Sequence, residues 1–325
     1  MTSAVNNDVI SVETGALLHP PAGAATGPLS AESSFSDWMQ ASQASTETAL
    51  DTFLPAPTTA PMRLHQAMRY ATLDGGKRVR PLLVHAAGLL FDADAACLSR
   101  AAAAVEMVHA YSLVHDDMPC MDDDALRRGK PTVHVQYDQA TALLVGDALQ
   151  TQAFIVLTAL RIEPARALAM TALLTQAAGS LGMCGGQAID LESVGVSLSL
   201  QELETMHRLK TGALLRAAVL LGAWCGKTPD AAETAALDAY ALAIGLAFQV
   251  VDDVLDATAD SVTLGKTAGK DAAANKPTYV SILGLDASRR LAATLREDAH
   301  RAVEPFGAKA QRLRELADLI VERRA

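Results

Sequence analysis

Apolar residues recur at helical spacing along almost the whole chain, beginning with FSDWMQASQASTETALDTFL at residues 35–54. Short runs rich in Gly, Pro and Asp, such as LDGGKRVRP, RRGKPT and CGKTPD, separate these segments and are typical helix breaks. Alanine is abundant and aromatic residues make up only 4% of the chain, a composition that favours closely packed helices over sheets. We therefore predict an all-α fold, a single bundle of about ten or more helices.

The domain organisation follows from the same pattern. The chain has 325 residues, enough for two ordinary domains. Residues 1–33 are rich in Ala, Gly, Pro and Ser and poor in charge, so we predict a mobile N-terminal extension there. No Pro/Ser-rich linker divides the helical segments that follow. Residues 34–325 are therefore predicted to form one domain.

The charge of the chain restricts its partners. The formal net charge is −10, and residues 1–62 contain acidic residues but no Lys or Arg. Nothing in the sequence resembles the basic face that nucleic acid requires. An anionic substrate would need metal ions or a local Arg/Lys cluster to overcome the overall negative field.

Cysteine spacing and hydropathy bear on location. The four cysteines have no paired spacing, so we predict neither a disulfide framework nor a zinc site. We expect the protein to be located in the reducing cytoplasm. No export or organelle signal is visible at the N-terminus. Apolar runs such as AYALAIGLAF stop short of the roughly 18 to 20 residues that a membrane span needs.

Two aspartate clusters each end an apolar helical segment. In LVHDDMPCMDDDALRRGKPT (residues 113–132), Asp116 and Asp117 close a segment that starts near residue 95, and Pro119 prevents the helix from continuing. The chain must turn there, so Asp122 can fold back toward Asp116. In FQVVDDVLD (residues 248–256), the first and last aspartates are four residues apart and share one helix face.

The clusters predict a metal site. Each could instead be an exposed acidic helix end, and for a single cluster that reading would be preferred. Two clusters, each beside basic loops, favour a cation. Carboxylates without His or Cys suit a hard ion, and Mg²⁺ usually binds one or two carboxylates plus substrate phosphates. Arg127 and Arg128 follow at once and can neutralise the remaining phosphate charge.

Basic loops supply further cations. DGGKRVRP places Lys77, Arg78 and Arg80 around a glycine turn at a helix start, where backbone N–H groups favour anions; the alternative is a turn with exposed cations. The lysines of RLKTGALL and TLGKTAGKD, taken alone, are typical of surface positions. GAWCGKT is one residue short of a nucleotide-binding loop and follows a helix, which argues against ATP or GTP.

Six segments together identify a family. GGKRVRP, HAYSLVHDDMPCMDDDALRRGKPTVH, GDALQTQAF, GGQAIDLE, LKTGALLRAAV and FQVVDDVLD resemble, in order and spacing, the trans-isoprenyl diphosphate synthases, most closely the bacterial farnesyl diphosphate synthases. The resemblance runs from about residue 34 to the C-terminus. It implies a polyprenyl synthase catalytic domain, a helical bundle around a deep central cavity, and a homodimer.

The resemblance also assigns residues. It implies Mg²⁺, three ions per site with Mn²⁺ as a substitute, held by Asp116, Asp117, Asp122, Asp252, Asp253 and Asp256. The pocket for isopentenyl diphosphate would contain Lys77, Arg80, His109 and Arg128. The allylic diphosphate would meet Arg127, Lys210, Thr211, Gln249 and Lys266. The resemblance counts Arg127, Lys210 and the six aspartates as catalytic.

The implied reaction is a head-to-tail condensation of isopentenyl diphosphate with dimethylallyl and geranyl diphosphate, giving farnesyl diphosphate and releasing diphosphate. Ser112 is one helical turn below Asp116, and Tyr111 beside it resembles the residue that stops the chain at farnesyl length; ordinary core packing is the alternative for Tyr111. Geranyl or geranylgeranyl diphosphate as the product is the alternative to a C15 product.

Other functions fit the sequence less well. Glu-x-x-His, typical of di-iron bundles, occurs at residues 106–109, 204–207 and 297–300, but that reading leaves the aspartates unused. A non-catalytic synthase subunit would be expected to lose one aspartate cluster. A terpene cyclase would not need the GGKRVRP loop. The C-terminal IVERRA favours a solvated helix end over a tail that closes on diphosphate.

Overall fold

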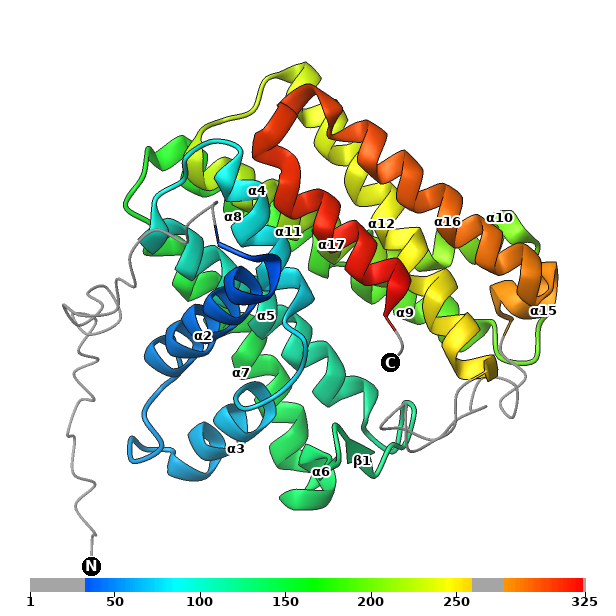
Figure 1. Ribbon diagram of the computed structural model, residues 1–325. Coiled ribbons are helices and arrows are strands. Elements are labelled where there is room, and N and C mark those ends of the chain that lie inside the picture. The colour runs from blue at the N-terminus through cyan, green and yellow to red at the C-terminus, as the bar shows by residue number, and fades with distance from the viewer. Residues whose placement is uncertain (1–32, 259–276, 324–325) are drawn as a thin grey trace, which may run out of the picture.

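The computed structural model describes residues 33–258 and 277–323, so the predicted extension lies almost entirely outside the described residues. The described chain is 77% helical, and the predicted all-α bundle is confirmed (Figure 1). The first half comprises α2 (Phe35–Phe53), α3 (Met62–Thr72), α4 (Val79–Leu89), α5 (Ala95–Asp116), β1 (Leu126–Arg127), β2 (Lys130–Pro131), α6 (Val133–Gln136), α7 (Gln139–Thr158) and α8 (Pro164–Ala178). The second half comprises α9 (Met183–Glu192), α10 (Leu200–His207), η1 (Arg208–Gly212), α11 (Ala213–Gly226), α12 (Ala231–Thr258), α15 (Tyr279–Leu283), α16 (Leu285–Ala302), η2 (Glu304–Ala310) and α17 (Gln311–Glu322).

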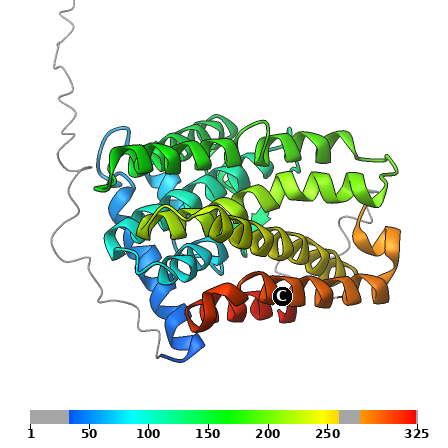
Figure 2. The ribbon, with the colours of Figure 1, turned by 90° about the horizontal axis from the view of Figure 1, so that it is seen from above.

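The helices pack in layers. Helix α5 packs mainly on α7, α12 on α16, and α11 on α4. Figure 2 shows α16 and α17 along one edge, the green helices α7 and α8 along the opposite edge, and α11 and α12 between them. Helix α5 passes through the interior, where Ala101, Ala102, Ala103 and Ala104 have no exposed surface. These small side chains let neighbouring helices approach closely, which accounts for the alanine-rich composition.

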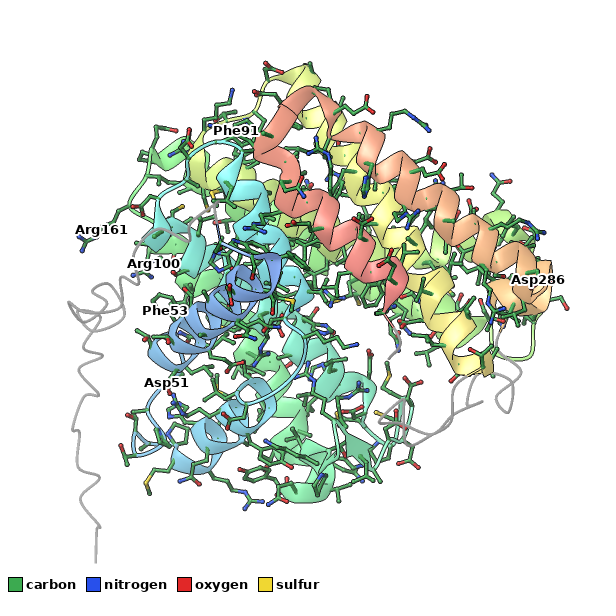
Figure 3. All side chains as sticks on the ribbon, in the orientation of Figure 1. Asp51, Phe53, Phe91, Arg100, Arg161 and Asp286 are labelled. Carbon is green, nitrogen blue, oxygen red and sulfur yellow. The ribbon has the colours of Figure 1, made fainter. Side chains whose placement is uncertain are left out.

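Caps and aromatic contacts fix the helices that border the centre. Asp94 caps the N-terminus of helix α5, because its carboxylate accepts the backbone N–H of Cys97 at 3.0 Å and so satisfies an otherwise unpaired donor. Arg100 of α5 lies over the ring of Phe53 of α2, with 4.7 Å between its guanidinium carbon and the ring centroid (Figure 3). This cation–π contact joins α2 to the central helix.

Four helical segments of the described chain are long and apolar enough to cross a membrane by length and composition alone: 139–158, 164–192, 200–226 and 231–258. The uninterrupted apolar runs in the sequence are shorter than these segments, because polar residues interrupt each of them. Between 33% and 61% of the most apolar window in each segment is buried inside the bundle. Much of this apolar surface therefore contacts other helices of the chain.

Two buried histidines predict how stability changes with pH. Burial lowers the pKa of His85 and of His207 from 6.5 to about 4, because a buried charge is costly. Among the described residues, neither ring nitrogen of either histidine has a hydrogen-bond partner that would offset this cost. Below pH 6.5 the two histidines therefore bind protons in the unfolded chain but remain neutral in the folded state. Their contribution is complete above pH 6.5 and is lost as the pH falls toward 4, at about 1.4 kcal/mol per histidine per pH unit.

Urea unfolding at several pH values between 6.5 and 4 measures this effect. The His85→Leu variant, which removes one of the two titrating rings from the core, should show a smaller fall in unfolding free energy over that range than the unmodified protein. Equal slopes for the two proteins would contradict the assignment of His85 as a buried neutral group.

Candidate active site

The first aspartate cluster folds as its proline predicts. Helix α5 ends at Asp116, and the chain returns so that the backbone N–H of Asp122 donates to the carbonyl of Asp116 at 2.9 Å. The N–H of Asp124 donates to the carbonyl of Asp117 at 3.2 Å. The predicted return of Asp122 to the helix end is thus confirmed, and the cluster becomes a closed loop beyond α5.

Asp117 and Arg127 form an ion pair. The Nε of Arg127, from strand β1, donates to both carboxylate oxygens of Asp117 at 2.8 Å, and its Nη2 reaches Oδ1 at 2.5 Å. Burial raises the pKa of Asp117, and the hydrogen bond from Arg127 opposes that rise. Two residues expected to meet metal and diphosphate separately therefore lie against each other in this structure.

The pKa of Asp116 is strongly shifted by its surroundings. Burial raises its pKa to about 6, the nearby Lys210 ammonium opposes the shift, and the Asp122 carboxylate adds to it. Lys210 lies in the π-helix η1, and its Nζ donates to Asp190 of α9 at 2.6 Å. Such π-helical turns are rare and occur frequently at functional sites. The charge of Lys210 therefore acts close to the end of α5.

The π-helix is fixed from two sides. Thr211 donates its hydroxyl to the side-chain oxygen of Gln249 on α12 at 2.7 Å. A Cβ at Gly186 of α9 would lie only 2.1 Å from the backbone nitrogen of Lys210, so the two backbones touch where only glycine fits. Close packing of α9, η1 and α12 thus determines where Lys210 and Thr211 lie.

The three aspartates of the second cluster have different partners. Asp252 accepts from Nη2 of Arg323 at 2.7 Å. Asp253 is buried, and its Oδ2 accepts the backbone N–H of Tyr279 at 2.7 Å. Asp256 is also buried, and its Oδ1 has no hydrogen-bond partner within the described part of the chain.

The basic loop lies next to this second cluster. Burial lowers the pKa of Lys77, Arg323 adds to that effect, and Asp252 opposes it. Burial lowers the pKa of Arg80 to about 10, which Glu106 and Asp252 oppose. Both cations therefore experience the charge of Asp252. The Nε of Arg80 is buried without a partner among the described residues, as expected of a donor that is directed at an anion.

His109 and Arg128 complete the basic group. The pKa of His109 is held well below its usual value by burial and by the surrounding arginines, first Arg80 and then Arg128. The guanidinium of Arg128 lies over the glycine turn, and a Cβ at Gly76 would be 2.6 Å from its Cζ. His109 is thus neutral at pH 7 and can donate one N–H. Lys266, the last predicted contact, lies outside the described residues.

The two predicted chain-length residues lie on α5. Tyr111 is buried, with its ring edge-on to His115 at 5.9 Å between centroids. Burial raises the pKa of Tyr111, and a hydrogen bond with Gln150 of α7 opposes the shift. Ser112 is half-buried and donates to the carbonyl of His109 at 2.9 Å.

These carboxylates fit a divalent cation. An orphaned oxygen on Asp256 and an Asp116 whose pKa is raised to about 6 by burial and by its acidic neighbours would both be relieved by positive charge. In residues 33–258 and 277–323, no three His, Cys, Asp or Glu side chains converge on one point. Oxygens from a bound phosphate would have to complete the coordination, which is the usual mode of Mg²⁺.

Two ion pairs at the site, Arg323 with Asp252 and Lys210 with Asp190, were not predicted from the sequence. Arg323, expected in a solvated helix end, is largely buried and lies over the ring of Phe248, 3.8 Å from its centroid, while it contacts Asp252. That expectation was wrong. Asp190 pairs with Lys210, and its only sequence signal was its place in the GGQAIDLE segment.

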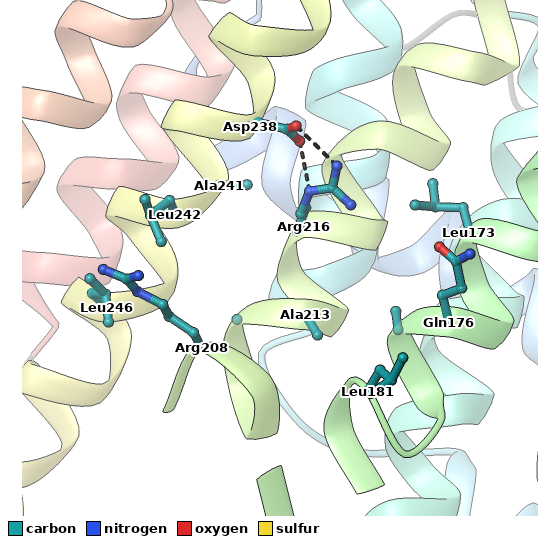
Figure 4. Close-up of a pocket in the computed structure, with 12 residues that line it drawn as sticks. Leu173, Gln176, Leu181, Arg208, Ala213, Arg216, Asp238, Ala241, Leu242 and Leu246 are labelled. Carbon is teal, nitrogen blue, oxygen red and sulfur yellow. Dashed lines mark hydrogen bonds and ion pairs between the residues drawn. The ribbon is translucent and has the colours of Figure 1, made fainter. Parts of the chain in front are cut away.

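Two cavities of the described chain differ in where they lie relative to the site. A cavity of about 290 Å³ lies between α8, α11 and α12, and its lining includes Leu173, Leu181 and Leu242 together with the Arg216–Asp238 ion pair (Figure 4). A smaller one of about 60 Å³ borders Asp117, Arg127 and Arg128. The larger cavity therefore lies apart from both aspartate clusters.

Fold and site together define a class of protein: an all-helical bundle with two acidic clusters and a basic loop suited to diphosphate. The chain belongs to the polyprenyl synthetase family, whose model matches residues 61–313. It is 49% identical to the probable farnesyl diphosphate synthase of Bradyrhizobium diazoefficiens, over 97% of this chain and 94% of that protein. The resemblance inferred from the six segments is thereby confirmed.

Solved structures agree. The apo structure of an FPP/GFPP synthase from Zymomonas mobilis superposes with a TM-score of 0.80 and 41% identity, over 88% of this chain and 98% of that one. The geranyltransferase of Helicobacter pylori complexed with magnesium and isoprenyl diphosphate superposes with a TM-score of 0.78 and 32% identity, over 89% of this chain and 97% of that one.

Proposed function

We propose that the chain is a prenyltransferase that condenses isopentenyl diphosphate with dimethylallyl and then geranyl diphosphate to make farnesyl diphosphate. This conclusion rests on the proximity of opposite charges. The charge of Lys210 opposes the rise that burial causes in the pKa of Asp116, and the charge of Asp252 opposes the lowering by burial of the pKa of Lys77 and of Arg80. Acid alone would repel a diphosphate, whereas acid, metal and cations together would bind two of them.

The six aspartates would hold magnesium. Asp116, Asp122, Asp252 and Asp256 would be its main ligands, and Asp117 and Asp253 would share their carboxylates with Arg127 and the N–H of Tyr279. Three Mg²⁺ per site, or Mn²⁺ in their place, would suit this number of oxygens. The metal would supply charge neutralisation of the departing diphosphate.

The side chains divide between the two substrates. Arg127, Lys210, Thr211, Gln249 and Lys266 would bind the allylic diphosphate. Lys77, Arg80, His109 and Arg128 would bind isopentenyl diphosphate, with neutral His109 donating its N–H. Lys210 would exchange its present partner Asp190 for a phosphate oxygen.

The reaction would need little proton transfer from the protein. The C1–O bond of the allylic substrate breaks and its electron pair stays on diphosphate, which Lys210 and Arg127 stabilise. The double bond of isopentenyl diphosphate then attacks C1 to form a C–C bond, and a proton leaves the adduct for the released diphosphate. The apolar side chains of α5 would keep water from the allylic cation.

The assembly would be a homodimer located in the cytoplasm. Apolar side chains are exposed on α7, at Leu143 and Leu144, and on α8, at Leu168. An exposed apolar face of this kind is typical of an interface. Sedimentation of the purified protein would show whether two copies associate.

A product assay tests the function. The purified protein is incubated with Mg²⁺, labelled isopentenyl diphosphate and dimethylallyl, geranyl or farnesyl diphosphate, and the products are sized after dephosphorylation. A C15 product from the first two primers is expected. Hydrocarbon made from farnesyl diphosphate alone would identify a cyclase, and no turnover would favour a non-catalytic subunit.

Product length should depend on Tyr111 and Ser112. Tyr111→Ala removes a buried ring five residues before Asp116 on α5, so products longer than C15 are expected. Ser112→Phe adds bulk at a half-buried position, so the product should shorten toward C10. Chromatography of the dephosphorylated products measures both, and unchanged lengths in the two variants would place the floor of the cavity elsewhere.

A further inference from the structure

Arg78 stands in the middle of the basic loop but has a different environment from its neighbours. Its backbone is left-handed, with φ 53° and ψ 38°, a conformation that is uncommon for residues other than glycine and stores strain. Its side chain is only 1% exposed. A buried charge on a strained backbone persists only where the surroundings hold it in place.

Every nitrogen of the Arg78 guanidinium has an acceptor. Nε donates to Glu47 of α2 at 2.7 Å, and Nη2 reaches the same carboxylate at 2.5 Å. Nη1 donates to Glu106 of α5 at 2.7 Å, and Nη2 also donates to the carbonyl of Thr72 at 2.6 Å. Two carboxylates from different helices thus compensate the buried cation.

The same helix α2 holds the loop at two further points. The side-chain amide of Gln43 donates to the carbonyl of Lys77 at 2.9 Å. The backbone N–H of Asp74 donates to Glu47 at 3.4 Å. The loop is therefore tied on both sides of its glycine turn, and Glu47 takes part in two of the ties.

Glu106 connects this network to the rest of the basic group. It lies one helical turn before His109 on α5 and is almost fully buried. Its carboxylate also opposes the lowering of the pKa of Arg80 and of Arg128 by burial. The Glu-x-x-His pattern at residues 106–109 thus has a structural explanation, because its glutamate is the partner of Arg78.

We infer that Arg78, held by Glu47 and Glu106, is a positioning residue for the pocket that binds the non-allylic substrate, isopentenyl diphosphate. This inference rests on the proposed function. Lys77 precedes Arg78 and Arg80 follows it by two residues, so the left-handed backbone between them sets the relative placement of two cations that both act near Asp252. Each guanidinium nitrogen of Arg78 already donates to a protein group, so we assign Arg78 a positioning role and no substrate contact.

The Glu47→Gln variant tests the inference. It removes one charge from the network but keeps the side-chain size, and its site is 35% exposed, so the fold should tolerate it. We expect the KM for isopentenyl diphosphate to rise roughly tenfold, as the loss of a charged hydrogen bond allows. The KM for geranyl diphosphate and kcat should change by less than about twofold, since only one pocket is displaced.

Asp238→Asn is the matched control. Asp238 forms a similar two-bond pair with Arg216, at 2.7 and 3.0 Å, away from the aspartate clusters. This variant should leave both KM values unchanged. In the double variant Glu47→Gln/Lys77→Ala, the rise in KM should be smaller than the product of the two single effects, because both changes act on one loop.

Three results would overturn the inference: an unchanged KM for isopentenyl diphosphate, an equal rise in both KM values with a lowered Tm, or independent effects in the double variant. Should the unmodified protein turn over no prenyl diphosphate, the proposed function fails separately. Calorimetric binding of isopentenyl diphosphate to the unmodified protein and the Glu47→Gln variant then decides the role of Arg78. Equal affinities would exclude it.

Discussion

Replacing Asp116 by asparagine is expected to lower kcat by about 10³-fold or more, because charge stabilisation of the leaving group is the main catalytic contribution in such a site. Burial and neighbouring acids raise the pKa of Asp116 to about 6. At pH 7 its carboxylate is ionised in the metal-free protein, but at a cost in folding free energy relative to the unfolded chain. The neutral amide removes that cost. The variant should therefore melt at an equal or higher temperature than the unmodified protein without Mg²⁺, and should gain less from added Mg²⁺.

Asp123→Asn is the control for this prediction. Asp123 lies in the same loop, is exposed, and has a left-handed backbone with φ 49°, which asparagine accommodates well. Steady-state assays and thermal melting with and without Mg²⁺ should show little change for it. Near-normal turnover in Asp116→Asn would refute the assignment of Asp116 as a magnesium ligand.

The sequence predicted those features that depend on local rules. Helical periodicity and alanine content gave the all-α bundle, because both act within one segment. Pro119 predicted the end of α5 and the return of Asp122, which the hydrogen bond from Asp122 to the carbonyl of Asp116 confirms. The glycine turn with Lys77 and Arg80 was also recognised, since turn chemistry is written in adjacent residues.

Features that depend on distant contacts were not predicted. Arg323 meets Asp252 across 71 residues, and nothing in IVERRA distinguishes a docked end from a solvated one. The partner of Lys210 is Asp190, and that of Arg78 is a pair of glutamates on two other helices. Long-range packing creates these pairs, so a local pattern shows the charge of each residue but not the partner.

The second cluster shows how one motif combines different tasks. Asp252 is 38% exposed at its side chain and pairs with Arg323, whereas Asp253 is buried against the N–H that starts α15. Asp256 keeps a buried oxygen without a partner among the described residues. Identical side chains at this spacing therefore need not respond alike to substitution, and that difference can be measured.

Asp252→Asn is expected to lower kcat by about 10²-fold or more, again through lost stabilisation of diphosphate, with little change in Tm. Arg323 keeps its hydrogen bond to the carbonyl of Phe248, and the side-chain oxygen of the new asparagine can still accept from it, so this change should barely affect folding. Asp253→Ala should behave differently, because it leaves the buried N–H of Tyr279 without an acceptor. We expect that variant to lose about 1–3 kcal/mol of unfolding free energy.

Urea unfolding and steady-state kinetics on the two variants separate these roles. If Asp252 lies at the diphosphate site, its variant must retain stability while losing turnover, and higher Mg²⁺ should restore part of the activity. A stable, fully active Asp252→Asn would remove the second cluster from the site and leave Lys77 and Arg80 without their acidic counterpart. An Asp253→Ala variant as stable as the unmodified protein would mean that the contact with Tyr279 does not hold α15 in place.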